Sequence, residues 1–207
     1  VLAERYTYVP YIGLALPFAF WIGHSAQKNN LFQVFIILFG ILFSVASFTR
    51  VLVWKSGDAL FSDVLEQFPR NPYAWDNRGG LYWDIYASKK FKDNPAKKKV
   101  FTDKAYHDYT MSLQLDASYI QPWSHRGILL FNTGRYEEAL NDFNTALKLQ
   151  PDYIDALIGR ANTLSTLQKY KEAIPDYDAY LKQRPDSAQA YVWRATAWHH
   201  LQEYDKA

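Results

Sequence analysis

The sequence predicts an all-α protein in which two transmembrane helices are followed by an α-solenoid of about 3.5 helix-pair repeats, the first interrupted by a basic insertion. Three observations support this fold class. Two long stretches near the start carry no charged residue, a pattern recurs in the second half of the chain, and its apolar residues follow the spacing of a helix face. We therefore expect a membrane segment over residues 1–55 and a solenoid over residues 56–207.

The recurring pattern is clearest where Gly134–Ala139 (GRYEEA) is followed 34 residues later by Gln168–Ala173 (QKYKEA). Phe143 maps onto Tyr177 at the same spacing, and the helix-ending Pro151 also recurs. A small residue, an aromatic residue, an alanine and a closing proline that recur together resemble the tetratricopeptide (TPR) repeat. The resemblance implies a solenoid of stacked helix pairs with a groove that binds a protein or peptide partner.

Within the repeat at 120–153, Trp123, Gly127 and Leu130 fall on one face of a predicted first helix. Gly127 and, on the second helix, Ala139 are small, so the two helices can approach closely. Each pair leaves an apolar side that the next pair covers.

The first elements in chain order are the two uncharged stretches. Residues 6–27 carry no Lys, Arg, Asp or Glu, and residues 31–49 are rich in Leu, Ile, Val and Phe. At ~0.3–0.6 kcal/mol each, the apolar residues of the second stretch favour membrane insertion. We predict transmembrane helices at about 8–25 and 31–54 and hence the lipid bilayer as a partner. The alternative for the first stretch is a buried core helix.

A short motif, Glu4-Arg5-Tyr6, precedes the first predicted span, and Ile12-Gly13-Leu14 lies within it. Together with the repeats that follow, these residues resemble the polytopic glycosyltransferase-like membrane proteins with C-terminal TPRs, which include the transmembrane-and-TPR protein O-mannosyltransferases. The resemblance implies the acceptor-recruiting, C-terminal part of a protein glycosyltransferase that uses a polyprenyl-phosphate sugar. It also implies an integral membrane protein with a periplasmic or luminal TPR part, whereas counting basic residues favours a cytoplasmic one.

Glu4, Arg5 and Tyr6 are candidate lipid-phosphate or interface residues. The planar guanidinium of Arg5 suits a phosphate at a membrane surface. The competing interpretation is that Arg5 pairs with Glu4 or with headgroups and only positions the helix.

The predicted solenoid begins with a half-repeat at 58–69 and continues with repeats at about 72–119, 120–153 and 154–187, and a truncated one at 188–207. The first full repeat is longer than the others because of an insertion at 89–99 that holds six lysines. We expect a solvated extension there, and contact with anionic headgroups is the alternative. Since the sequence starts at Val1 and stops within a repeat, we expect a piece of a longer protein.

Arginines and aspartates each recur at the repeat spacing and form two rows of opposite charge. We expect structural ion pairs between packed helices, because partly buried charges need partners. The alternative is that the arginines line the groove and bind phosphate or carboxylate. The predicted pairs join Arg78, Arg126, Arg160 and Arg194 with Asp108, Asp142 and Asp176.

The residues expected to face the groove are mixed in character, and they lack the Lys and Asn arrangement with which chaperone-type TPRs clamp a C-terminal carboxylate. Chaperone docking is therefore disfavoured. The polar groove candidates are Gln121, Ser124, Asn132, Asp155, Asn162 and Thr166.

Several function classes are excluded by composition. A net charge of +2 is too small to indicate nucleic-acid binding, and the absence of cysteine excludes disulfides and thiolate metal sites. His199 and His200 are adjacent on a predicted helix and point to different faces, so they predict no metal site. No catalytic motif or cofactor motif appears, so we predict no catalytic residue and no cofactor for this segment. The alternative to the transferase is a non-enzymatic, membrane-anchored TPR scaffold of an envelope complex, and no feature indicates an oligomeric state.

Overall fold

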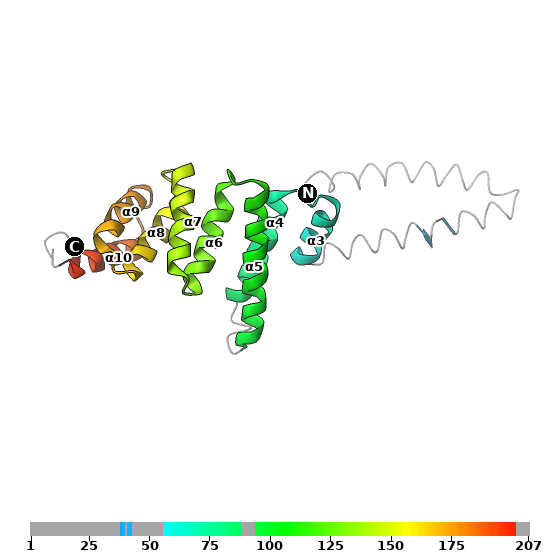
Figure 1. Cartoon of the computed structure of the whole chain (residues 1–207), viewed down its shortest axis with the longest axis horizontal. Coiled ribbons are helices and arrows are strands. Elements are labelled where there is room, and N and C mark those ends of the chain that lie inside the picture. The colour runs from blue at the N-terminus through cyan, green and yellow to red at the C-terminus, as the bar shows by residue number, and fades with distance from the viewer. Residues whose placement is uncertain (1–37, 40, 43–55, 88–93, 202–207) are drawn as a thin grey trace, which may run out of the picture. The chain divides into compact units, whose positions relative to one another are not determined.

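The structure is a computed structural model that describes residues 38–39, 41–42, 56–87 and 94–201. Residues 56–87 and 94–201 belong to the compact unit Ser56–Ala207. Its described regular structure consists of α-helices that follow one another along the array (Figure 1). The helices are α3 (Gly57–Gln67), α4 (Pro72–Ala87), α5 (Pro95–Leu115), α6 (Ile120–Asn132), α7 (Tyr136–Leu149), α8 (Ile154–Thr166), α9 (Tyr170–Gln183) and α10 (Ala188–His200).

Neighbouring helices pack as hairpins, with α4 on α5, α6 on α7 and α8 on α9. The first helices of successive hairpins also touch, α4 on α6, α6 on α8 and α8 on α10. The second helices α5, α7 and α9 make no comparable contact with one another. The first helices are therefore closer together and form the inner side of the array, as in a curved solenoid.

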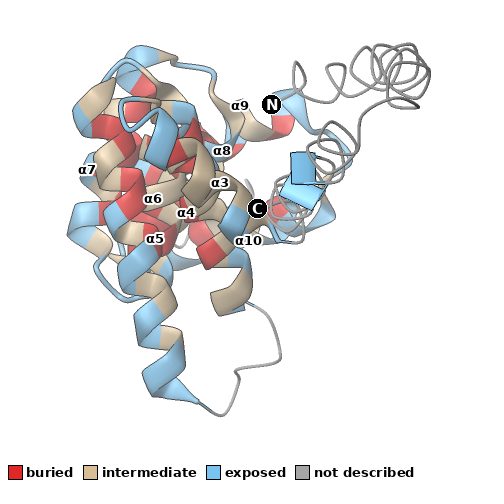
Figure 2. Ribbon diagram, turned by 90° about the vertical axis from the view of Figure 1, so that its right-hand side faces the viewer, coloured by how far each residue is buried: buried red, intermediate tan, exposed pale blue. Residues whose placement is uncertain are grey.

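Small residues allow this close packing. Phe143 of α7 is fully buried, and its ring lies between Gly127 of α6 and Gly159 of α8. A Cβ atom at Gly127 would lie 2.8 Å from the ring, and one at Gly159 would lie 2.4 Å from it. Ala139 is also fully buried, so a larger side chain has no room there. The buried residues face the contacts between neighbouring helices (Figure 2).

The turns inside the second and third full hairpins share one backbone feature. Gly134, between α6 and α7, has φ +80°, and Gln168, at the equivalent place between α8 and α9, has φ 60°. Glycine adopts this left-handed conformation without cost, whereas a residue with a Cβ atom is strained in it. The same turn is therefore relaxed in one repeat and strained in the next.

Helix α5 is longer than its equivalents, with 21 residues against 14 in α7 and in α9. The sequence predicted a solvated extension at 89–99, but α5 already begins at Pro95. Asn94 caps it by accepting a hydrogen bond from the Lys97 amide at 3.0 Å, and Pro95 suits the first turn. The extra turns protrude beyond the edge of the array (Figure 1).

The prediction of a membrane-spanning fold is corrected by the structure. In the part of the chain that it describes, no helix combines the length and the apolar character needed to cross a membrane. Even α5, which is long enough, carries Lys97, Lys98, Lys99 and Lys104, and each charge opposes insertion by roughly 2.5–3.5 kcal/mol. The predicted spans at 8–25 and 31–54 fall outside the described residues, except for residues 38–39 and 41–42. The predicted localisation as an integral membrane protein, periplasmic or luminal, depended on these spans and is corrected with them.

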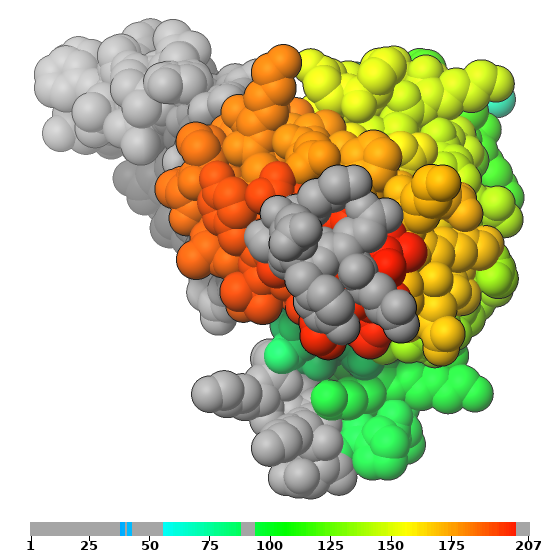
Figure 3. Space-filling model, turned by 90° about the vertical axis from the view of Figure 1, so that its left-hand side faces the viewer, coloured from blue at the N-terminus to red at the C-terminus, as the bar shows by residue number. Residues whose placement is uncertain are grey.

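The C-terminal end of the described array is formed by α9 and α10, which Figure 3 shows in orange and red. Tyr191 and Val192 of α10 are exposed, whereas Ala190 and Ala197 pack inward. The buried side of α10 thus packs against α9 and α8 of the preceding hairpin.

Candidate functional site

A hollow of about 200 Å³ lies on the inner side of the array, between the first helices α6 and α8. Its walls come from two successive repeats, so it exists only when the repeats stack. The lining residues are Ile128, Phe131 and Asn132 of α6, Phe143 of α7, and Asp155, Ile158, Gly159 and Asn162 of α8.

The floor of this hollow is the Phe143 ring, which the two glycines described above admit between α6 and α8. Ile128 and Ile158 are half-buried and form apolar walls. An apolar side chain placed here would be removed from water together with the apolar walls. This burial of apolar surface is the main favourable term in association. The hollow is therefore suited to one apolar side chain of a ligand.

Polar groups surround these apolar walls. Asn132 donates a hydrogen bond from Nδ2 to the Ile128 carbonyl at 2.8 Å. Asn162 accepts one from the Tyr177 hydroxyl at 2.9 Å through Oδ1, so its amide N–H groups are what it can offer a ligand. Asp155 is exposed, and it is the one charged residue among those that line the hollow.

Of the groove candidates from the sequence, Asn132, Asp155 and Asn162 line the hollow and the other three do not. Gln121 is exposed outside it. Ser124 is fully buried, and its Oγ atom has no hydrogen-bond partner in the structure. Thr166 donates to the carbonyl of its own helix at Asn162. Glu4, Arg5 and Tyr6 lie outside the described residues.

Helical periodicity in the sequence did not reveal the residues that shape the hollow. Phe131, Phe143 and Gly159 line it, yet none was a groove candidate. A signal for Gly159 was present, because a glycine within a helical pattern often marks a close approach. The contribution of Phe143, which reaches the groove from the opposite helix, depends on packing that periodicity does not reveal.

A partly buried polar cluster lies between α4 and α6. Asp76 is 5% exposed, and it accepts a hydrogen bond from the Tyr119 hydroxyl at 3.2 Å. His125 places Nδ1 2.8 Å from the other carboxylate oxygen of Asp76. Burial lowers the pKa of His125, but the hydrogen bond to Asp76 and the charges of Asp76 and Asp155 outweigh it and leave the pKa raised. The imidazole thus favours its protonated form at this site.

Three of the four repeat arginines contact the predicted aspartates. The distances from Nε are 2.7 Å for Arg78 to Asp108, 2.7 Å for Arg126 to Asp142 and 2.6 Å for Arg160 to Asp176. In each pair Nη2 donates to the second carboxylate oxygen, so the contact is bidentate.

The fourth arginine behaves differently. Arg194 contacts Asp178 of the preceding helix at 2.6 Å, and no contact with Asp176 is present.

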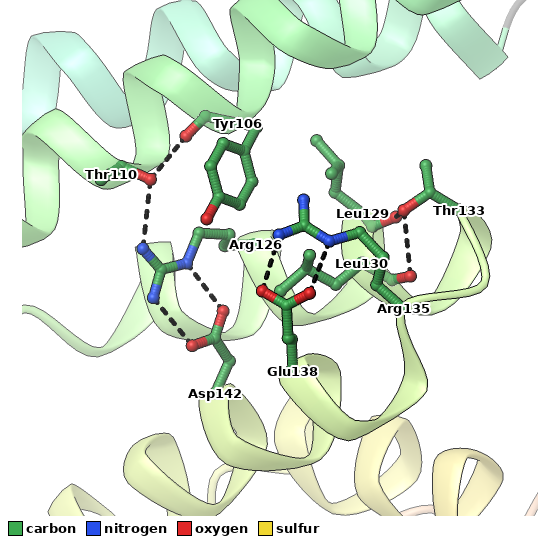
Figure 4. Close-up of polar contacts among 9 residues, drawn as sticks. All are labelled: Tyr106, Thr110, Arg126, Leu129, Leu130, Thr133, Arg135, Glu138 and Asp142. Carbon is green, nitrogen blue, oxygen red and sulfur yellow. Dashed lines mark hydrogen bonds and ion pairs between the residues drawn. The ribbon is translucent and has the colours of Figure 1, made fainter.

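The arginines also reach back to the preceding hairpin through Nη1. Arg126 donates to Thr110 at 3.1 Å and Arg160 to Asn144 at 3.1 Å, each 16 residues earlier. Figure 4 shows Arg126 between Thr110 of α5 and Asp142 of α7. The arginine side chains therefore join helices of adjacent repeats, and none of them lines the hollow between α6 and α8.

The charges of these arginines are stabilised by their partners. The hydrogen bond to Asp176 raises the pKa of Arg160 against the effect of burial. For Arg126, burial lowers the pKa, and the hydrogen bond to Asp142 and the negative charge of Asp142 together outweigh it, so the pKa is raised. Both side chains therefore stay charged, and their partners satisfy them.

Metal chemistry finds no support in the geometry of the described helices, where no group of His, Cys, Asp and Glu side chains could hold an ion. The rings of His199 and His200 lie 6.1 Å apart at 72° to each other. His200 instead stacks on Tyr170 at 4.5 Å.

Comparison with known families identifies the repeats. Residues 120–153 and residues 158–207 each match a family described as Tetratricopeptide repeat. The prediction of TPR repeats from the spaced residues is thereby confirmed. No curated protein matches the chain. The resemblance to glycosyltransferase-like polytopic membrane proteins finds no support in these comparisons.

Solved structures share the fold. The alignment with the crystal structure of MamA covers 70% of this chain and 77% of the MamA chain, with a TM-score of 0.59 and 18% sequence identity. The first TPR of Spaghetti (RPAP3), bound to the HSP90 peptide SRMEEVD, covers 63% and 95%, with a TM-score of 0.54 and 22% identity. A thermophilic TPR protein in Thermus thermophilus, TTC0263, covers 73% and 76%, with a TM-score of 0.58 and 18% identity. At these identities the likeness concerns the fold alone.

Proposed function

We propose that the TPR array of this chain is an interaction module that binds an extended segment of a partner protein in the groove between α6 and α8. The observation that carries the proposal is the hollow with apolar walls and polar surroundings on the inner side of the array. Concave solenoid surfaces are extended binding surfaces, and apolar pockets with a few polar groups are the usual form of a binding site.

The proposed anchor is one apolar side chain of the partner, inserted between Ile128 and Ile158 above Phe143. Burial of apolar area contributes about 25 cal/mol per Å², so a single anchor supplies a large part of the affinity of a short segment. The polar atoms around it then set the direction and register of the bound chain.

The proposed register contacts are the side-chain amides of Asn132 and Asn162. Amide groups can pair with the backbone of an extended segment, whose N–H and C=O groups lack partners within the segment itself. Asn162 is held in place by Tyr177, so little side-chain entropy is lost on binding.

Charge restricts the partner. Asp155 is the one formal charge on the lining, and no Lys or Arg belongs to that set of residues. The SRMEEVD peptide in the Spaghetti complex is acidic at its C-terminal end. A segment of that kind would meet no compensating cation in this hollow, so we propose a neutral or basic partner.

The transferase-linked role implied by the sequence resemblance has no observation in its favour and is not part of this proposal. The interaction module as proposed needs no catalytic group, and it serves as a non-enzymatic scaffold.

A displayed library of nine-residue segments, selected on the full chain, tests the proposal. Enriched segments should share an apolar residue, and Ile128→Ser should weaken their binding by about ten-fold or more. The matched control is Leu149→Ser, since Leu149 is exposed on α7 outside the hollow. If Ile128→Ser and Leu149→Ser bind the enriched segments equally well, the groove is not the binding site.

A further inference from the structure

A second and larger hollow, of about 430 Å³, lies at the edge of the array, away from the groove residues. It is an open hollow bordered by the protruding half of α5, the end of α4, and α6 with the turn that follows it. The lining residues are Tyr86, Pro95, Lys98, Lys99, Thr102, Asp103, Tyr106, Leu129, Thr133 and Arg135.

This hollow depends on the extra length of α5. Pro95, Lys98 and Lys99 belong to the turns that precede the point at which a helix of ordinary length would start. A second helix of 14 residues that ended at Leu115, as α5 does, would begin near Thr102 and would leave the hollow open on that side. The insertion in the first repeat therefore builds a wall that the other repeats lack.

The charged groups of the lining are mostly positive. Lys98, Lys99 and Arg135 are the cations of the lining, and Asp103 is its one carboxylate. Arg135 is held by two hydrogen bonds to Glu138, of 2.7 and 2.6 Å (Figure 4). With Arg135 balanced by Glu138, the two lysines exceed the remaining acid by one charge.

Aromatic rings fix two of the cations. Lys98 Nζ lies 5.2 Å from the centroid of the Tyr86 ring, and Arg135 Cζ lies 4.8 Å from that of Tyr106. Such contacts contribute about 0.5–1 kcal/mol at exposed sites and restrict where the charged heads lie. The cations are therefore partly ordered before any ligand arrives.

We propose that this hollow binds a small organic phosphate. Lysine binds phosphate as a point charge, and Lys98 and Lys99 supply two such charges at one end of the lining. Tyr86 and Pro95 supply an apolar surface for the organic part. The volume lies within the range of about 300–1,000 Å³ that is usual for small-molecule sites. This site is separate from the peptide groove, and the proposal for it does not depend on the proposal for the groove.

The test uses the full chain and phenyl phosphate as the probe, followed by amide chemical shifts. Saturable shifts are expected at Thr102, Leu129 and Thr133, with a dissociation constant on the order of 1 mM. Inorganic phosphate, which lacks the ring, and benzoate, which carries a single charge, should each bind several-fold more weakly.

Two variants distinguish binding in the hollow from non-specific attraction of the phosphate to positive charge. Replacing both lysines, Lys98→Gln with Lys99→Gln, should weaken phenyl phosphate binding by about ten-fold. Lys104→Gln removes one positive charge from the same helix outside the hollow, where Lys104 lies over the Tyr82 ring, and should change binding less than two-fold.

Four outcomes would overturn the proposal. These are no saturable shift at the lining amides, an equal loss on Lys104→Gln, equal binding of benzoate, or inorganic phosphate binding as tightly as phenyl phosphate. A phosphotyrosine peptide is tested as a further ligand. If the peptide binds and phenyl phosphate does not, the ligand is a protein segment and the assignment to a small molecule is wrong. Circular dichroism confirms that each variant is folded.

Discussion

Arg126 and Asp142 are joined by two hydrogen bonds of 2.7 and 2.8 Å across the α6–α7 hairpin. Both side chains are largely removed from water, at 15% and 6% exposure. The third donor of the guanidinium reaches Thr110 in the preceding hairpin. One side chain therefore links three helices, and a single carboxylate provides its ion pair.

Asp142→Asn should lower the free energy of unfolding by about 2–4 kcal/mol, because it leaves Arg126 buried without its counter-charge. Urea denaturation measures this loss. Glu138→Gln is the matched control, since the Arg135–Glu138 pair is exposed and should contribute less than about 1 kcal/mol. Equal effects of the two substitutions would contradict a special role for the buried pair.

Gly159→Ala should destabilise the array by about 1–3 kcal/mol, because the new Cβ atom would lie 2.4 Å from the buried Phe143 ring. Combining it with Phe143→Leu should cost less than the sum of the two single changes, and a double-mutant cycle in urea measures this coupling. In contrast, Gly80→Ala meets nothing within 4 Å and should stabilise α4 by about 0.5–1 kcal/mol. Additive effects at Gly159 and Phe143 would show that the two do not restrict each other.

The turn residues with positive φ should respond in opposite directions. Gln168→Gly relieves the strained backbone at φ 60° and should raise the free energy of unfolding by about 0.5–1 kcal/mol. Gly134→Ala introduces the same strain at φ +80° and should lower it by about 1 kcal/mol. Thermal melts of the two variants measure both changes, and a shift of the same sign in both would be inconsistent with this explanation.

Stability should depend on pH through His125. Its pKa is raised in the folded protein, so its contribution is fully present below the unfolded pKa of about 6.5 and is lost as the pH rises through the folded value. The wild type should therefore lose stability between pH 6 and pH 8 relative to His125→Gln. Urea midpoints of both proteins at several pH values measure the difference, and parallel curves would exclude the effect.

Much of the array was predictable because each repeat encodes the same contacts. The spacing of Gly127 and Ala139 predicted two closely packed helices, and the common register of Arg126 and Asp142 placed them opposite each other across one hairpin. These inferences depend on neighbours within one repeat, where helix geometry fixes the relation.

Features that depend on several elements were not predictable in the same way. The early start of α5 was missed, since a run of lysines suggested a solvated insertion, although lysine is a good helix former and Asn94-Pro95 is a typical start. The groove contribution of Phe143 requires knowledge of two other helices. The membrane prediction is corrected because no helix that the structure describes is long and apolar enough to cross a membrane.

The arginine contacts carry a consequence for how such an array changes in length. Arg126 and Arg160 each meet an aspartate 16 residues later, whereas Arg78 meets Asp108 after 30 residues, a difference of 14. The first hairpin has therefore accepted 14 extra residues at its tip while the charge pair at its base stayed intact. Insertions into the turns of the other hairpins should likewise be tolerated. The array could therefore gain protruding segments at its edge while its Arg–Asp pairs stay in place.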